Sequence, residues 1–383
     1  METTLEEGKN TMNTKKEDVE SAAEKEAHSI ASHYVAYVSA YTTQTSENFG
    51  IHVYDVDMEK GRFSEKEKVQ ISNSSYISIS HNRKYLYSIT DFGVESYRIG
   101  KNGELAFINQ AGINGMRGSY LSLDYTDSWL FVAGYHDGKI TVLKLDPVTG
   151  AIGRITDEVY HRGMGSVAER NFHPHVQCVK MTRDNRFLCA ADLGLDHTKV
   201  YSFNSETGKL RQVDIIRGAM GSAPRHIKFS KDGRFLYIVN EMNNTIDVCS
   251  YTWDGKEPNF ERIQTVSTLN QYHTADASAS ALTFSEDYQY LLSSNDGDNS
   301  VVIFRVDEKT GKLTKVLCLP ISGVYPKDCA LFPDNRHLVS LNQSSNTMTF
   351  FTCDLDKGTL VMNGKSMRIE RPNCIIFYPL MEE

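Results

Sequence analysis

Apolar and polar positions along this chain follow one pattern that occurs six times. Its clearest copy, PRHIKFSKDGRFLYIVNE, occupies residues 224–241. The pattern predicts an alternating strand, a polar turn around an Asp or Asn, and a second strand that opens with an aromatic residue and Leu. A polar loop and a third strand of alternating apolar residues follow. Each copy therefore indicates a unit of short antiparallel strands.

The spacing of the copies indicates how these units are arranged. Aligned on the Leu of the second strand, they fall at Leu86, Leu130, Leu188, Leu236, Leu291 and Leu338. The intervals are 44, 58, 48, 55 and 47 residues. A period of roughly 40–50 residues with about four short strands per unit is typical of the blades of a β-propeller.

The two ends of the chain complete a seventh unit. Residues 34–41 match a second strand, with Ala36 at the Leu position, and residues 372–377 match the missing first strand. We therefore expect an all-β fold, a seven-bladed β-propeller of four-stranded antiparallel blades whose last blade is closed by both termini, leaving no unpaired edge. Residues 33–383 should form this single domain. Residues 1–32 are rich in Glu, Lys, Thr and Ser and predict a disordered or loosely helical acidic arm.

The composition agrees with a β-rich domain and indicates the cellular compartment in which we expect it. Hydrophobic residues make up 40% of the chain, which contains 20 Tyr and 17 Phe, and aromatic residues favour strands. No apolar run approaches the roughly 18 residues of a membrane helix, and the first residues lack the basic and then apolar order of a signal peptide. The seven Cys form no CxxC pair and indicate a reducing compartment. We expect a cytoplasmic protein without membrane association.

The net charge and the absence of several sequence motifs exclude some classes of ligand and of catalysis. A net charge of −8 argues against a nucleic-acid surface, because a phosphate backbone requires a basic stripe. It does not exclude a small anionic substrate held by a few local cations. The sequence contains no Walker loop, GxGxxG, HExxH or GxSxG motif, so we expect no cofactor and neither zinc proteolysis nor α/β-hydrolase catalysis.

The longest interval between copies contains HRGMGSVAERNFHPH at residues 161–175. We expect a long loop there that presents Arg170, His173 and His175. Pro174 fixes its own φ and restrains the residue before it, so the two imidazoles are held in a set geometry. Solvated loop histidines are the alternative interpretation. Two ligands of fixed spacing do not define a metal site, and we expect no metal.

Polar residues also stand at the ends of neighbouring predicted strands. Asp192 ends one second strand, where turn formation together with Asp196 is the alternative to a functional role. Arg225 starts a first strand and Glu241 follows the next second strand, so antiparallel pairing brings both to one rim. Arg can bind a carboxylate or phosphate through two parallel hydrogen bonds, and a structural Arg–Glu pair is the alternative. Lys327 is a second cation at the start of a first strand, in the last full unit.

Four motifs in this chain resemble those of the propeller-type lactonase family. They are HxGxGxxxxR…HPH at residues 161–175, DLGxD at 192–196, GSxPRHxxFxxDGRFLYxxNE at 221–241 and NQxSNT at 342–347. The resemblance covers about residues 33–378. It implies a seven-bladed propeller that acts on a lactone at one channel mouth without metal or nucleotide. The best-known activity of this family is 6-phosphogluconolactonase, and the fungal carboxy-cis,cis-muconate lactonizing enzymes are related to it.

The resemblance also implies the residues of the site. The implied catalytic residues are His175, Arg225 and Glu241, and the substrate-binding residues are Arg170, His173, Asp192 and Lys327.

Three positions depart from the family pattern. Asp296 stands where many members have Arg, Lys327 follows a Pro where members often have Arg, and residues 115–120 replace a common Pro-Cys-His start. These differences affect the prediction of a phosphorylated substrate more than they affect the prediction of the fold.

The expected activity is that of a carboxylic-ester hydrolase acting on a sugar lactone. The expected substrate is 6-phospho-D-glucono-1,5-lactone of the pentose phosphate pathway. His175 suits a general base near neutral pH, with Glu241 orienting it or sharing the role. Arg225 suits an oxyanion or anion binder, while Arg170 and Lys327 could meet a phosphate or carboxylate.

Two other functions stay open. One is a lactonase or muconate-type lactonizing enzyme for another substrate, which Asp296 keeps under consideration. The other is a non-catalytic scaffold propeller, although the GH…WD signatures of such scaffolds are absent from the sequence. A scaffold has no reason to bring His175, Arg225 and Glu241 together at a pocket. We expect a small-molecule lactone as the partner of this chain, which should be a monomer or weak homo-oligomer.

Overall fold

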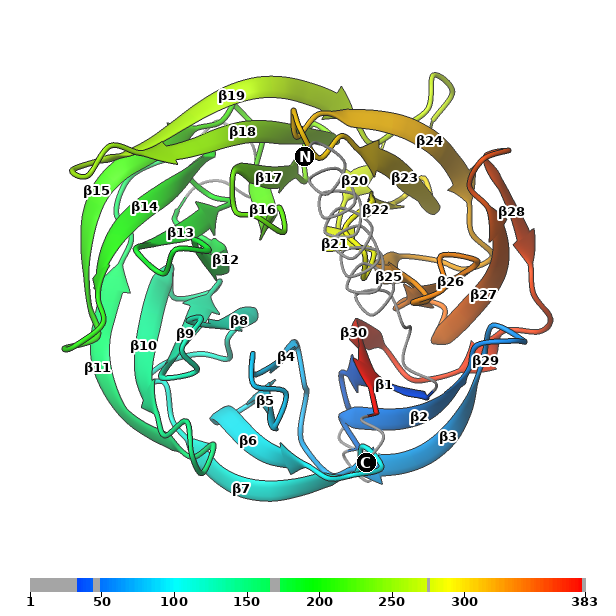
Figure 1. The fold of residues 1–383 in the computed structure, drawn as a ribbon, viewed down its shortest axis with the longest axis horizontal. Helices are drawn as coiled ribbons and strands as arrows, with labels where there is room; N and C mark the ends of the chain where they lie inside the picture. Colours follow the sequence, from blue (N-terminus) through cyan, green and yellow to red (C-terminus); the bar gives the residue numbers. More distant parts are fainter. Residues whose placement is uncertain (1–32, 44–48, 166–172, 274–275, 381–383) are drawn as a thin grey trace, which may run out of the picture.

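Seven antiparallel sheets follow one another around a central axis in the computed structural model (Figure 1), which describes residues 33–43, 49–165, 173–273 and 276–380. Five sheets have four strands, and two carry one additional short strand. The predicted seven-bladed β-propeller is confirmed. The arm predicted for residues 1–32 lies outside the described residues. In the described part of the chain, no helix has the length and apolar character needed to cross a membrane.

Each blade runs outward from a first strand near the axis. The first strands are β4 (Ile77–Ile79), β8 (Tyr120–Leu123), β12 (Val176–Met181), β16 (Pro224–Phe229), the pair β20 (Ser278–Ala279) and β21 (Thr283–Phe284), β25 (Pro326–Leu331) and β30 (Pro372–Pro379). The second strands are β1 (Tyr34–Ala40), β5 (Tyr85–Thr90), β9 (Trp129–Gly134), β13 (Phe187–Asp192), β17 (Phe235–Asn240), β22 (Tyr290–Asp296) and β26 (His337–Asn342).

The third and fourth strands form the outer part of each blade (Figure 1). The third strands are β2 (Ile51–Asp57), β6 (Gly93–Ile99), β10 (Lys139–Leu145), β14 (His197–Asn204), β18 (Thr245–Trp253), β23 (Ser300–Val306) and β27 (Thr347–Asp354). The fourth strands are β3 (Arg62–Val69), β7 (Leu105–Ala111), β11 (Ile152–Tyr160), β15 (Lys209–Arg217), β19 (Pro258–Ser267), β24 (Leu313–Pro320) and β28 (Thr359–Met362) with β29 (Met367–Arg368).

Both ends of the described chain build the last blade. β30 pairs antiparallel with β1, from Tyr34↔Pro379 to Ala40↔Pro372, and β2 and β3 complete the sheet. This is the closure that the sequence predicts. Because the first and last segments share one sheet, the ring is held shut by backbone hydrogen bonds between them.

The second strands are the most buried part of the blades. Every residue of β13 and β17 is buried, and the six aligned Leu residues are each 0% exposed. A short, continuously apolar strand is the pattern expected when both of its faces are covered, here by neighbouring blades.

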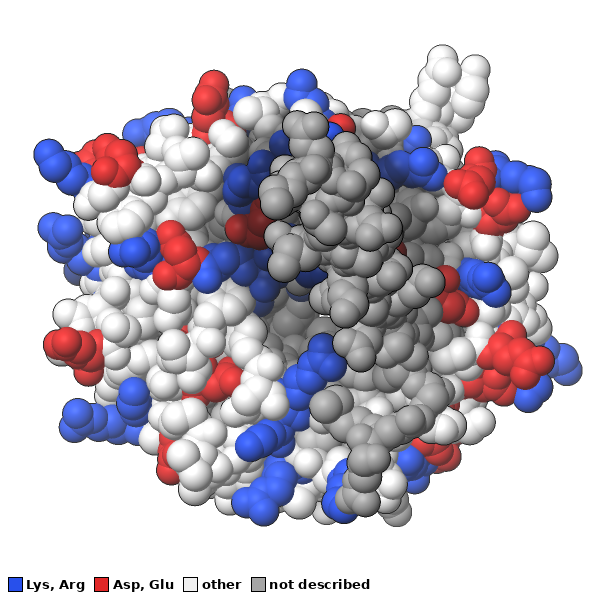
Figure 2. Space-filling model, viewed as in Figure 1, with Lys and Arg blue, Asp and Glu red and all other residues white. Residues whose placement is uncertain are grey.

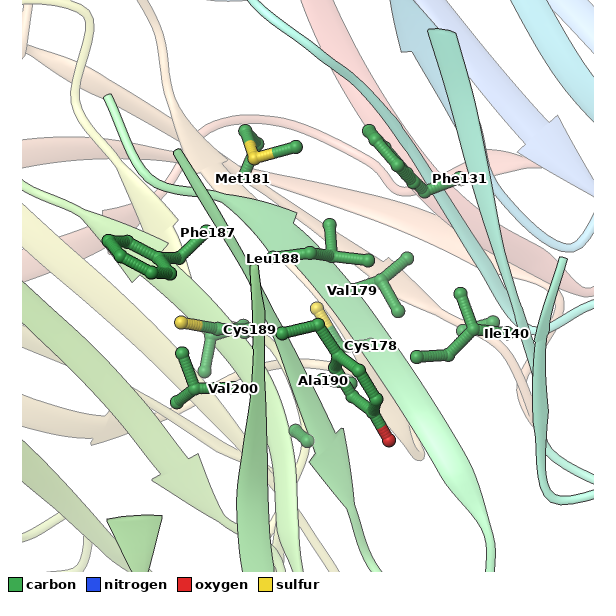
Figure 3. Packing of buried hydrophobic residues seen from close by; sticks show 14 of the residues in the cluster. Phe131, Ile140, Cys178, Val179, Met181, Phe187, Leu188, Cys189, Ala190 and Val200 are labelled. Carbon is green, nitrogen blue, oxygen red and sulfur yellow. The ribbon is translucent and has the colours of Figure 1, made fainter. Parts of the chain in front are cut away.

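Apolar side chains of adjacent blades pack against one another. In Figure 3, Phe131 and Ile140 of β9 and β10 lie near Val179 and Leu188 of β12 and β13. Each such burial contributes roughly 1.5–3 kcal/mol. All seven Cys are free and buried, and Cys178 belongs to this cluster, where a thiol acts as a small apolar group.

Candidate active site

A cavity of about 260 Å³ lies at the end of the channel where the first strands begin. Its polar lining includes Arg117, His136, Gln177, Arg225, Glu241, Tyr325, Lys327 and Asn373. These side chains come from five of the seven blades. Only closure of the ring brings such distant parts of the sequence to one cavity.

A β-bulge at the start of four first strands helps to form this lining. In β16, the residues on either side of Arg225 pair with successive residues of β17, so Arg225 is the extra residue. Gln177 in β12, Lys327 in β25 and Asn373 in β30 are extra residues in the same way. All four line the cavity. Because a bulge re-aims a side chain, it places these residues at the channel independently of strand alternation.

The residues that follow the second strands supply further parts of the lining. Tyr41, Tyr135 and Glu241 each lie five residues after the aligned Leu position of their repeat, and all three line the cavity. The lining is thus built largely from two equivalent positions of the repeat, one at the start of the first strand and one after the second strand.

Two of the lead-in loops, the residues just before a first strand, are latched to the preceding blade. The carboxylate of Asp196 accepts the backbone N–H groups of Gly221 and Ala223, both at 2.9 Å. The Oδ1 atom of Asn299 accepts the N–H of Tyr325 at 2.9 Å. Ala223 and Tyr325 have φ angles of 54° and 57°, an uncommon conformation for residues other than Gly. A Pro and then the bulge residue follow each of them, so the latch fixes where the bulge side chain starts.

Arg225 and Glu241 form an ion pair in the cavity wall. Nη1 of Arg225 donates to Oε2 of Glu241, and both side chains are buried. The backbone N–H of Glu241 also donates to the carbonyl of Ala223 at 2.9 Å. The sequence-based expectation that these two residues meet at one rim is confirmed, while their catalytic role stays a prediction.

Tyr325 and Lys327 form a second polar pair beside the first. Nζ of Lys327 donates to the Tyr325 hydroxyl at 2.9 Å. Burial raises the pKa of Tyr325, but the positive charges of Lys327 and Arg225 and the Lys327 hydrogen bond outweigh it, so the pKa is lowered from its ordinary value. Sequence reasoning did not place Tyr325 in the site. The available signal was its position before Pro326, equivalent to Ala223 before Pro224.

Asp192 holds the lead-in loop of β12 rather than lining the cavity. Its Oδ2 lies 2.6 Å from Nδ1 of His161, whose Nε2 lies 2.9 Å from the Tyr201 hydroxyl. Its Oδ1 accepts the N–H groups of His175 at 2.8 Å and Leu195 at 3.1 Å. Burial lowers the pKa of His161, although Asp192 opposes the shift. The contacts of Asp192 indicate a positioning role beneath the site.

His175 lies behind Tyr135, outside the described lining of the cavity. The two rings stack with centroids 4.2 Å apart, and Nδ1 of His175 lies 3.0 Å from the Tyr135 carbonyl oxygen. That contact assigns the proton to Nδ1 and leaves Nε2 as an acceptor in the neutral ring. Burial lowers the pKa of His175. The exposed His173 ring lies 4.1 Å from the His175 ring. The predicted Arg170 falls outside the described residues.

Arg117 is a lining residue that sequence reasoning did not assign to the site. Its Nη1 donates to Oδ1 of Asp91 at 2.8 Å, and its guanidinium lies 4.8 Å from the Tyr41 ring centroid. Its side chain is 31% exposed, so it stands at the mouth of the cavity, whereas Arg225 is buried. The only sequence signal was the departure of residues 115–120 from the family pattern.

The surroundings of the axis are more basic than the whole chain. Figure 2 shows Lys and Arg side chains gathered along one side of the central hollow, although the net charge is −8. Among the described residues, no group of three or more His, Cys, Asp or Glu is placed to hold a metal ion. Asp296, where many family members have Arg, accepts the N–H of Gly297 at 2.8 Å in its own loop.

The fold and the cavity place this protein among seven-bladed propellers with a polar site at one end of the channel, here built from an Arg–Glu pair and a Tyr–Lys pair. The chain belongs to the lactonase family of seven-bladed β-propellers, since the family described as "Lactonase, 7-bladed beta-propeller" matches residues 35–377. The resemblance inferred from the motifs is confirmed.

Similar proteins cover nearly the whole propeller. The 6-phosphogluconolactonase of Bacillus subtilis (strain 168) is 30% identical over 350 residues, which are 90% of this chain and 98% of that protein. The structure of the periplasmic gluconolactonase of Pseudomonas aeruginosa matches with a TM-score of 0.83 at 27% identity, covering 91% of this chain and 100% of that one. A Lactobacillus plantarum protein matches with a TM-score of 0.80 at 27% identity, covering 90% and 99%.

Proposed function

We propose that this protein hydrolyses 6-phospho-D-glucono-1,5-lactone to 6-phosphogluconate, a reaction of the pentose phosphate pathway. The observation that carries the proposal is the convergence of Arg225, Glu241, Tyr325 and Lys327 on one cavity of a lactonase-family propeller. The similarity to the Bacillus subtilis 6-phosphogluconolactonase favours the phosphorylated substrate.

Arg225 stabilises the charge that develops on the lactone carbonyl oxygen. Water addition at C1 turns this oxygen into an oxyanion. A guanidinium that is already fixed by Glu241 needs no reorganisation as the charge forms, and such preorganised donors are commonly the largest single contribution to catalysis of this kind.

Tyr325 takes the proton of the attacking water. A phenol whose pKa is lowered by Lys327 and Arg225 is closer to the range that suits a general base at neutral pH. As the bond from C1 to the ring oxygen breaks, the Tyr325 hydroxyl returns the proton to that oxygen. The carboxylic acid product then releases its own proton to water. The sequence-predicted base, His175, is the second candidate, since its Nε2 is an acceptor in the neutral ring.

Arg117 binds the phosphate on C6 at the mouth of the cavity. Its planar group can offer two parallel hydrogen bonds to phosphate, and its partial exposure suits the end of the substrate that carries no reacting bond. The buried Arg225 and the half-buried Tyr325 then meet the lactone end.

The proposal is tested by following the loss of 6-phosphogluconolactone beside unphosphorylated gluconolactone, each against its spontaneous opening. We expect kcat/KM to be at least about tenfold higher for the phosphorylated lactone, the gain of about 1.4 kcal/mol that a charge-assisted contact readily supplies. Preference for gluconolactone would replace the proposed substrate. Failure to accelerate either reaction would refute the lactonase assignment.

Arg117→Met should separate recognition of the phosphate from the chemistry. We expect KM for the phosphorylated lactone to rise about tenfold, as one charge-assisted contact is lost, with kcat and the rate on gluconolactone little changed. Arg371→Met is the matched control, because the Arg371 guanidinium also lies over Tyr41, at 5.2 Å, but does not belong to the described lining. Equal KM values for Arg117→Met and the unaltered protein would contradict the role of Arg117.

Asp196→Ala should lower both stability and turnover. Two backbone amides lose their acceptor, which costs about 1–3 kcal/mol, and the start of β16 loosens, so kcat/KM should fall about 10- to 100-fold through misplacement of Arg225. Thermal unfolding and lactone hydrolysis measure the two effects. The control is Asp307→Ala, since Asp307 accepts two N–H groups, of Lys309 and Thr310, within its own exposed turn and should leave turnover unchanged. Full activity of Asp196→Ala would show that the latch does not position Arg225.

A further inference from the structure

A second cavity of about 530 Å³ occupies the other part of the central channel. It is formed by first strands and the turns that join first to second strands, and it shares Tyr76 and Asp328 with the active-site cavity. It is large enough for a small organic molecule. The proposed lactone hydrolysis gives this second cavity no role.

A cluster of three rings lies where the two cavities adjoin. Tyr76 packs at a tilt against Tyr120 with ring centroids 4.1 Å apart, and the His226 ring lies 5.9 Å from that of Tyr76 and 5.3 Å from that of Tyr120. Tyr120 lines the second cavity, His226 lines the active-site cavity, and Tyr76 lines both. The rings therefore stand where the two cavities adjoin, and the cations that line one cavity differ from those that line the other.

Two lysines project from equivalent positions of adjacent blades into the second cavity. Lys180 is the fifth residue of β12 and Lys228 is the fifth residue of β16, and both line the cavity. Within the described chain, neither ammonium group has a hydrogen bond or ion pair with another residue. Burial first, and then the nearby charges of Lys228 and Arg183, lower the pKa of Lys180 to about 7. Partly buried cations without partners are unfavourable.

The same fold shows how a structural buried lysine is satisfied. Lys139 donates to the carbonyl oxygens of Ile113 and Asn114 at 2.7 and 3.0 Å and to Oε1 of Glu158 at 2.7 Å. Lys180 and Lys228 have no such set of acceptors among the described residues. Their cost is offset if an anion occupies the space between them.

The acidic groups of this cavity accept their hydrogen bonds from other groups than the two lysines, although the charge of Lys228 acts on Asp328 and opposes the rise of its pKa. Asp328 accepts the N–H groups of Cys329 at 2.9 Å and Ile375 at 3.0 Å, and burial raises its pKa to about 6. Glu286 accepts the Tyr34 hydroxyl at 3.4 Å, and burial raises its pKa.

Cations outnumber anions on the wall. The charged lining consists of Arg83, Lys180, Arg183 and Lys228 against Glu286 and Asp328, four cations against two anions, with His81 paired to Asp127 at 3.0 Å.

An aromatic wall stands next to the lysines. The Arg183 guanidinium lies 5.3 Å from the Tyr125 ring and 5.5 Å from the Tyr288 ring, and its Nη2 donates to the Tyr288 hydroxyl at 2.6 Å. Phe284 packs on Tyr288 with centroids 4.8 Å apart. This fixed face of rings suits a flat or cyclic group attached to the anion.

We propose that this second cavity is a binding site for a small phosphate monoester that carries a ring, with Lys180 and Lys228 holding the phosphate and the aromatic wall holding the ring. A phosphate monoester has a charge of about −1.5 to −2 near pH 7, which matches two adjacent ammonium groups. The site is separate from the active-site cavity and does not rest on the proposed lactone hydrolysis.

Pyridoxal 5′-phosphate is a suitable probe, since it carries a phosphate, an aromatic ring and an aldehyde. In the labelling reaction Lys228 keeps hold of the phosphate while the aldehyde condenses with the unprotonated amine of Lys180 to an imine and releases water. Hydride from borohydride then reduces the imine to a stable secondary amine. At pH 7 about half of Lys180 is unprotonated, given its pKa of about 7, against on the order of one in a thousand for an ordinary lysine. Reduction followed by peptide mass spectrometry then identifies the labelled lysine.

We expect label preferentially at Lys180 and none at Lys139. Pyridoxal without the phosphate should label Lys180 at least about tenfold less, and inorganic phosphate should protect it. Lys228→Met should reduce the ratio of phosphate-bearing to phosphate-free labelling, while Lys327→Met, in the other cavity, should leave Lys180 labelling unchanged. Label spread over surface lysines, equal labelling by both aldehydes, or loss of Lys180 labelling in Lys327→Met would each overturn the proposal.

Discussion

Tyr325→Phe is expected to lower kcat for the lactone by about 100-fold at neutral pH, the range usual for losing a general base. The phenyl ring preserves the shape of the cavity, so KM should change little and the protein should remain folded. The hydroxyl that Lys327 contacts at 2.9 Å is the group removed. Steady-state hydrolysis, corrected for spontaneous opening and checked against thermal unfolding, measures the effect.

The pH profile distinguishes a base from a merely structural hydroxyl. If Tyr325 acts as its phenolate, kcat/KM rises with pH as the hydroxyl loses its proton. Lys327→Met removes a cation that lowers the pKa of Tyr325, so the pKa moves upward and the rise shifts to higher pH. A hydroxyl that only filled space would leave the profile of Lys327→Met where it was.

His175→Ala provides the comparison with the base predicted from sequence. Because His175 stacks behind Tyr135 and does not belong to the described lining, we expect a loss of turnover several-fold smaller than that of Tyr325→Phe. The reverse order of effects would return the role of base to His175 and remove it from Tyr325. Unchanged turnover in a folded His175→Ala protein would take His175 out of the chemistry altogether.

Arg225→Met should produce the largest combined loss of activity and stability. Removing an oxyanion donor lowers kcat about 10²- to 10³-fold. The same change removes the cation that forms an ion pair with the buried Glu241 carboxylate, which should cost about 3 kcal/mol of unfolding free energy, at the low end because the cavity admits water. Chemical denaturation and steady-state kinetics report the two losses separately.

The double variant Arg225→Met with Glu241→Gln separates structure from chemistry. Replacing the carboxylate by a neutral amide removes the negative charge that Arg225 no longer balances, so much of the lost stability should return while turnover stays low. Recovery of turnover together with stability would mean that the pair is only structural. That result would contradict the assignment of Arg225 to the oxyanion.

Much of the fold could be predicted from the sequence because each blade is specified by a short pattern of apolar and polar residues, and this pattern recurs along the chain. Each aligned Leu, from Leu86 to Leu338, occupies a strand that must be apolar on both faces, and all six are fully buried. The match of residues 34–41 with residues 372–377 predicted closure, and β1 and β30 pair accordingly. Strand periodicity and repeat spacing suffice for such features, since they depend on burial and backbone pairing alone.

The candidate site was predictable only in part. Arg225 and Glu241 stand at opposite ends of paired neighbouring strands, so their meeting followed from antiparallel pairing. Tyr325 and Arg117 escaped prediction because each becomes a lining residue only through a lead-in loop placed by the ring. His175 was expected beside Arg225, but its ring stacks on Tyr135 outside the described lining of the cavity.

The sequence by itself determined the repeating strands, their burial, the closing of the ring and the lactonase-family resemblance, because these depend on short-range alternation and regular spacing. Only the tertiary structure decided which side chains reach the channel. The bulges at Arg225 and Lys327 and the latches from Asp196 and Asn299 set those directions. Such contacts join different strands or blades, and a one-residue shift in register changes where a side chain lies.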